Sequence, residues 1–164
     1  MLILGIDPGT ATTGYGLIEH DGKDFKVIEW GLIETTKDLT AEIRLVKIHK
    51  DLNSLIERVK PDIFAIERVF FATNAKTAIA VGQAIGVMML SASFAGLAVI
   101  EYAPGTIKKS ISGDGRADKK KMQAAVRQLL GAKVKSAAHK KTHFDNAADG
   151  LAVALCHIFN TTHV

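Results

Sequence analysis

The chain has 164 residues, 48% of them hydrophobic, which fits one globular domain with a sizeable core and excludes an intrinsically disordered protein. An acidic residue at position 7 does not fit the apolar segment of a signal peptide. The single cysteine, Cys156, has no partner for an internal disulfide, which suits a reducing compartment. We therefore expect residues 1–164 to form one domain of a cytoplasmic protein.

The net charge of +4 conceals a strongly basic segment. Residues 104–141 contain eleven Lys and Arg and two acidic residues, a balance of +9, and the rest of the chain carries a balance of −5. A basic segment on an otherwise acidic body indicates a polyanionic partner bound on one face. Nucleic acid is favoured over a merely solvated lysine-rich surface.

The first apolar segment, residues 2–6, is typical of a buried strand. It ends at Asp7, because Pro8 has no backbone donor and Gly9 tolerates positive φ. Asp7 therefore lies where a buried strand reaches the surface. Asp before Pro-Gly is also common turn chemistry, so this segment alone does not establish a functional role.

Two further strands are expected at residues 10–19 and 26–34, which are rich in β-branched and aromatic residues and flank a tight Asp-Gly turn. Together with the first strand they predict an antiparallel meander.

Residues 38–59 carry a helical stripe of apolar side chains that is expected to face the core. Asp38 is the expected cap, and Pro61 ends the helix because the residue before proline resists helical geometry. The apolar positions of the stripe are 39, 43, 46, 52, 55, 56 and 59.

Residues 62–67 repeat the opening pattern, since a short apolar strand again ends on a carboxylate, Glu67. A strand reached through a helix lies parallel to its neighbour by a right-handed crossover. If that neighbour is the first strand, Asp7 and Glu67 emerge side by side at the carboxyl edge, where the ligand chemistry of α/β sheets usually lies.

Residues 77–100 carry no charge, which raises the question of a membrane span. The stretch consists more of Ala, Gly and Ser than of Leu or Phe, and Gly96 divides it, so a buried helix followed by a strand over 97–102 is favoured. Gly82 and Gly86 permit the close approach of another element, either the sheet of the same chain or a second subunit.

The basic segment begins at Pro104, and its glycines at 113 and 115 predict a mobile loop. Asp118 is expected to cap a helix with apolar positions at 122, 126, 129 and 130. Lysines 119–121 are poorly placed for the helix dipole, but beside helix-end amides they suit a phosphate group.

The last helix is expected from about residue 144 to 159 and is apolar almost throughout. Its first turns nevertheless carry Asp145 and Asp149, which share a face because they are four residues apart. Acids at a helix start also favour the dipole, but a carboxylate on an apolar helix is costly unless a cation answers it. Asp7, Glu67 and Asp149 thus predict a site of oxygen ligands, which suits two Mg²⁺ or Mn²⁺ ions acting on a phosphodiester.

Four segments together resemble the RuvC family of bacterial Holliday-junction resolvases, within the RNase H-like nuclease superfamily. They are GIDPGTATTGYG, AIERVFFATNAKTA, KKSISGDGRADKKKM and FDNAADGLAVAL, they fall in the family's order, and the similarity covers essentially the whole chain. The resemblance implies an α/β fold with an RNase H-like mixed five-stranded sheet. Its first three strands are antiparallel, the later strands are parallel, and helices cover both faces.

The resemblance also implies a homodimer that nicks two opposed strands of a four-way DNA junction and works with the branch-migration motor proteins RuvA and RuvB. The family's metal-binding acids fall on Asp7, Glu67 and Asp149, with two Mg²⁺ or Mn²⁺ ions per site. A fourth ligand position falls on Asn146, and these four residues are the expected catalytic set.

The expected DNA contacts also follow from the resemblance and from the basic segment. The aromatic residue that probes the centre of the junction falls on Phe70, and one of Phe70 and Phe71 is expected in the core. Important family lysines fall on Lys108 and Lys119, and Arg116 lies between them in the basic segment.

Asn146 departs from the family pattern, which has aspartate or sometimes histidine at this position. The segment FDNAAD differs from FDDAAD by one acid converted to its amide, so a catalytically weakened, deliberately inactivated variant is the leading hypothesis. The competing hypothesis is that Asp145 takes over as ligand.

Three rival functions remain in view. A sugar-kinase-like or actin-like ATPase requires a second phosphate loop and a nucleotide domain that 164 residues cannot hold. An RNase H-like nuclease of ribosomal RNA processing shares the acids at the strand ends but not the VFFA segment. The third rival is a junction-binding protein that does not cleave.

Overall fold

The structure is a computed structural model that describes residues 1–69, 75–131 and 141–161, and for residues 141–146 it describes only the backbone. The elements in chain order are β1 (Leu2–Asp7), β2 (Thr12–His20), β3 (Phe25–Glu34), α1 (Ala41–Val59), β4 (Ile63–Glu67), α2 (Ala75–Phe94), β5 (Ala98–Tyr102), α3 (Pro104–Ser112), α4 (Lys119–Leu130) and α5 (Lys141–Thr161).

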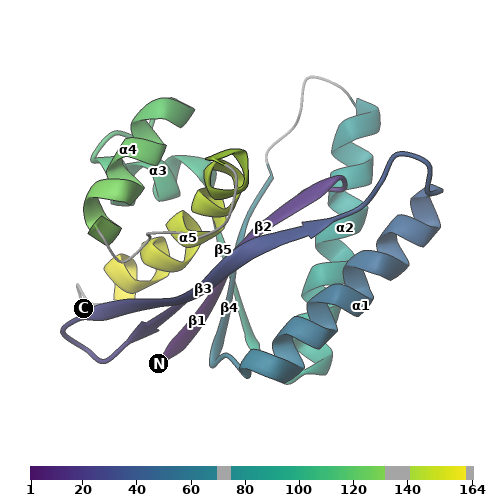
Figure 1. Cartoon of the computed structure of the whole chain (residues 1–164), viewed down its shortest axis with the longest axis horizontal. Coiled ribbons are helices and arrows are strands. Elements are labelled where there is room, and N and C mark those ends of the chain that lie inside the picture. Colours follow the sequence, from purple (N-terminus) through teal and green to yellow (C-terminus); the bar gives the residue numbers. More distant parts are fainter. Residues whose placement is uncertain (70–74, 132–140, 162–164) are drawn as a thin grey trace.

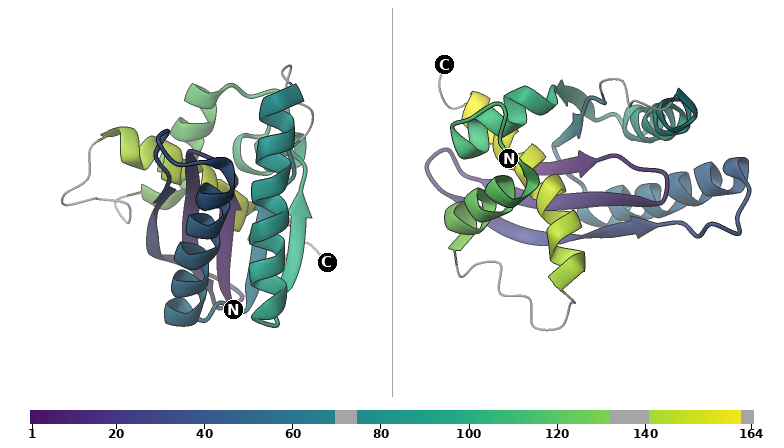
Figure 2. Two further views of the ribbon diagram at one scale, coloured as in Figure 1. Left: turned by 90° about the vertical axis from the view of Figure 1, so that its right-hand side faces the viewer. Right: turned by 90° about the horizontal axis from the view of Figure 1, so that it is seen from above.

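The strands form one mixed five-stranded sheet in the order β3-β2-β1-β4-β5. The meander β1-β2-β3 is antiparallel, and β4 and β5 continue it in parallel with β1. Helices cover both faces, with α1 and α2 on one side and α3, α4 and α5 on the other (Figures 1 and 2). The sheet and the crossover expected from the sequence are confirmed.

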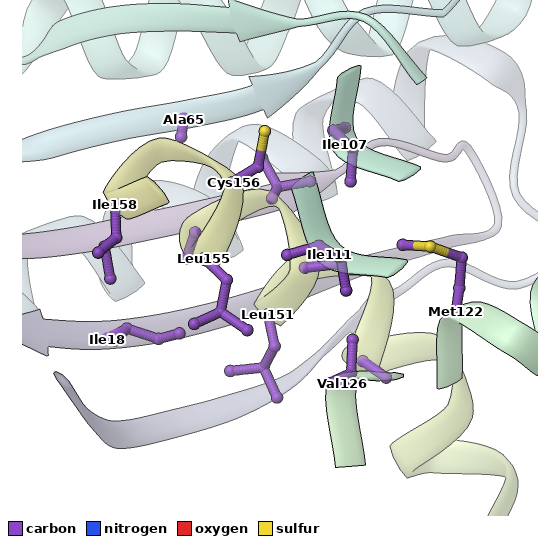
Figure 3. Close-up of a cluster of buried hydrophobic side chains, with 14 of the residues drawn as sticks. Ile18, Ala65, Ile107, Ile111, Met122, Val126, Leu151, Leu155, Cys156 and Ile158 are labelled. Carbon is purple, nitrogen blue, oxygen red and sulfur yellow. The ribbon is translucent and has the colours of Figure 1, made fainter. Parts of the chain in front are cut away.

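One hydrophobic core lies between the sheet and α5, with α3 and α4 packed on its outer side (Figure 3). Helix α5 is apolar on all sides because it is sandwiched between these layers. Leu151 and Leu155 are completely buried, and each such side chain contributes about 1.5–3 kcal/mol relative to an exposed one. This core holds α5 firmly across the strands.

The second core lies between the opposite face of the sheet and α1 and α2. The sequence stripe described α1 only in part, because the buried residues of that helix begin at Ile48, whereas Ile43 and Val46 are 48% and 46% exposed. The expected cap was also wrong: the residue at the N-cap is Thr40, and Asp38 lies before it.

The composition of α2 predicted a buried helix, but the structure buries only one face of it. Ala84, Met88 and Ala92 lie in the core, and a methyl group added at Gly82 or Gly86 meets no atom of the described part of the chain within 4 Å. These glycines therefore do not serve the approach of the chain's own sheet. By length and composition α2 could also cross a membrane, but the core helix of a soluble protein passes the same test. Of the 18-residue window that meets these criteria, 22% is buried.

The basic segment begins with a helix that the sequence analysis did not predict, and the loop expected around Gly113 and Gly115 is the turn that follows this helix. Helix α3 begins with Pro104 at its first turn and ends at Gly113, whose φ of 75° provides the left-handed cap. A short turn leads to α4, where Asp118 caps the helix as predicted by accepting a hydrogen bond from the backbone of Lys121 at 2.8 Å. Of the predicted apolar positions on α4, Leu129 is 37% exposed and does not join the core.

Candidate active site

Asp7 and Glu67 are the last residues of the neighbouring parallel strands β1 and β4. The ladder pairs Ile6 with Ile66, so the following residues leave the sheet side by side at its carboxyl edge. Both strands are hydrophobic because they are buried from both faces, and the carboxylates mark where each strand leaves the core. The adjacency predicted from the sequence is confirmed.

Asp149 reaches this edge because α5 lies unusually close to the sheet. A methyl group at Gly5 would collide with the backbone of Gly150 and Ala154, and one at Gly16 would lie 2.7 Å from the Cα atom of Leu151. Because glycine has no side chain, α5 packs directly against the sheet at these two positions. This close packing brings the carboxylate of Asp149 near the ends of β1 and β4.

A cavity of about 230 Å³ opens where these elements meet. It is lined by Asp7, Glu67, Pro104, Ile107, Lys108, Lys119, Met122, Asp149 and Ala152. A larger hollow beside the β2–β3 turn, about 680 Å³, is lined from that hairpin alone and does not bring charged groups together from distant segments. The apolar members of the small cavity come mainly from α3 and α4, and those of α3 were missed because no helix was predicted at the start of the basic segment.

The carboxyl groups of this cavity disturb one another. Burial, followed by the charges of Glu67 and Asp149, raises the pKa of Asp7 well above its usual value. Burial also raises the pKa of Glu67, which a hydrogen bond from Asp7 partly offsets. Asp7 is hydrogen-bonded to Glu67, and a cation bound beside the pair would favour the ionised form of both groups.

Two lysines supply positive charge to the same cavity. The Lys119 ammonium lies 3.4 Å from the Asp149 carboxylate, and its charge lowers the pKa of Asp7. Lys108, on α3, acts in the same direction on the pKa of Glu67. Lys121 faces elsewhere, because its ammonium pairs with Asp114 at 2.8 Å.

Arg116 lies on the exposed turn between α3 and α4, where its backbone donates to the carboxylate of Asp114 at 2.9 Å. Phe70 and Phe71 lie outside the described residues, so their predicted placement is not tested. Asn146 lies on α5, three residues before Asp149, but its side chain and that of Asp145 belong to the undescribed part of that helix.

The donor set fits a divalent cation in its chemistry, since three carboxyl groups from three elements line one cavity and two of them have raised pKa values. Among the described side chains, no three His, Cys, Asp or Glu are close enough together to hold one ion as they stand. In the protein alone Asp7 is hydrogen-bonded to Glu67, and Asp149 is paired with Lys119.

The mixed sheet, with acidic residues at the carboxyl ends of β1 and β4 and a third on the helix that crosses them, places this chain in the RNase H-like class of folds. Among solved structures, Thermus thermophilus RuvC in complex with a Holliday junction substrate superposes with a TM-score of 0.86 at 30% identity and covers 99% of this chain and 96% of that one. The yeast mitochondrial Holliday junction resolvase Ydc2 shares the fold with a TM-score of 0.71 at 15% identity, covering 98% and 82%.

The family follows from the sequence comparisons. The family model described as crossover junction endodeoxyribonuclease RuvC matches residues 3–157. The protein of that name from Caldicellulosiruptor saccharolyticus is 47% identical over 165 residues, covering 100% of this chain and 96% of the relative, and that of Syntrophomonas wolfei is 43% identical, covering 96% and 88%. The chain belongs to the RuvC family of crossover junction endodeoxyribonucleases, and the resemblance seen in the sequence is confirmed.

Proposed function

We propose that this chain resolves four-way DNA junctions by hydrolysing phosphodiester bonds in two opposed strands, in recombination and repair. The observation that carries the proposal is the meeting of Asp7, Glu67 and Asp149 in one cavity beside the lysines of α3 and α4, in a chain of the RuvC family. The same arrangement gives no support to an ATPase, which needs a second phosphate loop.

We assign the carboxylates of Asp7, Glu67 and Asp149 to the binding of two Mg²⁺ or Mn²⁺ ions, with Asn146 at the fourth ligand position. Such a pair of ions would supply an activated water and stabilise the leaving oxygen. Bound cations would replace the hydrogen bond between Asp7 and Glu67, and Asp149 would exchange its contact with Lys119 for a cation.

The basic groups around the cavity bind the DNA backbone. Lys108 and Lys119 line the cavity itself and are placed to hold the phosphate group on which the carboxylates act, and the exposed Arg116 extends the surface along the turn between α3 and α4. Phe70 follows β4 by three residues and is assigned to the unpaired centre of the junction, where an aromatic ring can wedge between bases.

Symmetric cleavage requires two active sites, and we assign the dimer contact to the exposed face of α2. Ile79, Leu90 and Phe94 are 64%, 51% and 79% exposed, and Gly82 and Gly86 lie open between them. Small residues four apart allow two helices to approach closely, and the apolar side chains flanking them favour burial. Action with the motor proteins RuvA and RuvB, in the cytoplasm, completes the proposal.

The test is incubation of the chain with a labelled mobile junction, a linear DNA duplex and a structured RNA, with and without Mg²⁺. Junction cleavage that requires Mg²⁺ supports the proposal. Cleavage of the RNA alone supports a nuclease of ribosomal RNA processing, and tight junction binding without cleavage in any variant, including Asn146→Asp, supports a binding protein.

A further inference from the structure

A hydrogen bond at the end of β5 connects the sheet to α5. The hydroxyl of Tyr102 lies 2.9 Å from Nδ1 of His157, and the two rings meet edge to face with centroids 6.0 Å apart. His157 is 5% exposed. Neither residue lines the cavity of the three acids, and the chemistry proposed above uses neither of them.

Burial lowers the pKa of His157 and raises that of Tyr102, so burial favours the uncharged form of each group. Between the two neutral groups either the phenol donates to Nδ1 or Nδ1–H donates to the phenol oxygen, according to the imidazole tautomer. Loss of this hydrogen bond would leave a polar group of the buried imidazole unsatisfied, which costs free energy. The hydrogen bond therefore fixes the orientation of both rings.

The strand partner of Tyr102 is Glu67. The two residues face each other at the ends of β4 and β5, and the carbonyl of Tyr102 accepts the backbone hydrogen bond of Arg68 at 2.8 Å. Glu67 is thus held between β1, which carries Asp7, and the strand that ends in Tyr102. A shift of the end of β5 displaces Glu67 with it.

His157, the partner of Tyr102 on α5, lies about two turns after Asp149. At about 1.5 Å per residue this separation is about 12 Å along the helix. Cys156, next to His157, and Ala65, two residues before Glu67 on β4, belong to the same buried cluster, so β4 packs against α5. The turn of α5 that contains His157 also binds α3, because Asn160 donates to the hydroxyl of Ser110 at 3.0 Å. Elements that carry Glu67, Asp149 and Lys108 therefore meet around the turn that contains His157.

We propose that Tyr102 and His157 are positioning residues, whose hydrogen bond fixes the end of β5 to α5 and thereby sets the separation of Glu67 and Asp149 for metal binding. The inference rests on the proposed function, since it gives the pair a role only if these acids hold the cations. It predicts that the pair acts on metal affinity and on the chemical step, and not on junction binding.

The experiment compares Tyr102→Phe with Tyr15→Phe as a matched control. Tyr15 also has a partly buried ring and a hydroxyl that is hydrogen-bonded to a side chain, the carboxylate of Glu29, at 2.7 Å, but its ring packs in the core on the other side of the sheet. Each variant is measured for Mn²⁺ binding by calorimetry, for junction binding without metal, for thermal unfolding, and for cleavage in both the Asn146 and the Asn146→Asp backgrounds.

We expect Tyr102→Phe to bind Mn²⁺ and to cleave roughly tenfold less well, the scale of a small misplacement of catalytic groups, with junction affinity within about twofold. His157→Gln, whose amide can donate or accept a hydrogen bond, is expected to retain most of the affinity, whereas His157→Leu is expected to match Tyr102→Phe. Equal Mn²⁺ affinity in Tyr102→Phe and Tyr15→Phe overturns the inference, as does a loss in His157→Gln as large as in His157→Leu. If the unsubstituted chain and its Asn146→Asp form neither bind Mn²⁺ nor cleave, the proposed function itself is wrong.

Discussion

The ammonium group of Lys119 lies 3.4 Å from the carboxylate of Asp149, so in the protein alone a lysine takes the place beside this acid that we assign to a metal ion. Lys119 has two competing partners in the proposed function, the carboxylate and a DNA phosphate. Arrival of the phosphate draws Lys119 away and leaves Asp149 to the cation. Metal binding and DNA binding are therefore expected to assist each other.

The first prediction is that Lys119→Gln binds Mn²⁺ more tightly than the unsubstituted protein in the absence of DNA. A partly exposed ion pair is worth up to about 1 kcal/mol, so the gain is roughly fivefold. Calorimetry measures it, with Lys119→Arg, which keeps the charge, and the neighbouring Lys120→Gln as controls. An equal gain in Mn²⁺ affinity in Lys120→Gln would show that the effect comes from overall charge and that Lys119 does not compete with the metal for Asp149.

The second prediction concerns the salt dependence of junction binding. Neutralising Lys108, Arg116 and Lys119 together should weaken binding and reduce the slope of log K against log salt by roughly 2 to 3, because each phosphate contact releases about one counterion. The control neutralises Lys23, Lys26 and Lys60, which lie away from the carboxyl edge of the sheet. The same slope in both triple variants would place the phosphate contacts elsewhere.

The third prediction follows from the raised pKa of Asp7. A carboxyl group whose pKa is higher folded than unfolded stabilises the fold below its unfolded pKa of 3.8, and this contribution is lost as the pH rises toward the folded value. At neutral pH without metal, Asp7→Asn should therefore raise the free energy of unfolding, by on the order of 1 kcal/mol, and abolish cleavage.

Denaturant unfolding at pH 4 and pH 7 measures this gain, which should shrink at the lower pH. Asp38→Asn is the control, because a hydrogen bond with Thr36 lowers the pKa of that exposed carboxyl group. Asp7→Asn that is less stable than the parent at pH 7 would show that the three acids are not in electrostatic conflict.

The fourth prediction concerns the exposed face of α2. Gly86→Leu should leave the fold of the monomer intact, since a Cβ atom added there meets no atom of the described residues within 4 Å, and should weaken the dimer more than tenfold by separating the two helices. Sedimentation at several concentrations measures the dimer, with Ser54→Leu on the exposed part of α1 as control. A dimer of unchanged strength in Gly86→Leu would exclude this face.

The sequence was sufficient for the adjacency of Asp7 and Glu67, because a strand, a crossover helix and a second strand have one favoured handedness and the carboxylates mark both strand ends. The position of Asp149 close to the sheet could not be predicted, since it depends on contacts of Gly5 and Gly16 with a helix at the other end of the chain. The close approach of a helix to a strand leaves no periodic pattern in the sequence.

Helix α3 was missed for a local reason. Its nine residues include a proline, a glycine and two serines, which are poor helix formers, and burial of Ile107 and Ile111 against α5 overrides that preference. The spacing of these isoleucines, four residues apart, was the available signal. The first turns of α1 were misassigned because an apolar stripe does not reveal which of its positions reach the core.

The last prediction concerns Asn146. Asparagine keeps the size of aspartate and one carbonyl oxygen, so the fold persists, but it removes a full negative charge beside the divalent cations. Changes behind the ligands of a metal site already cost about 10–100-fold, and loss of a ligand charge should cost at least as much. Asn146→Asp should therefore cleave junctions at least about tenfold faster than the present chain, at equal protein and Mg²⁺, and bind the junction no more tightly.

The competing ligand is Asp145, which on an ideal helix points about 100° away from position 146. Asp145→Asn separates the two hypotheses: if Asp145 substitutes as ligand, this change abolishes cleavage in the Asn146 chain, and if it does not, the rate stays low and unchanged. Calorimetric titration with Mn²⁺ supports the comparison, because restoring the acid at position 146 should tighten metal binding. Equal cleavage rates for the unsubstituted chain and its Asn146→Asp variant would show that the amide is a fully working residue of this active site.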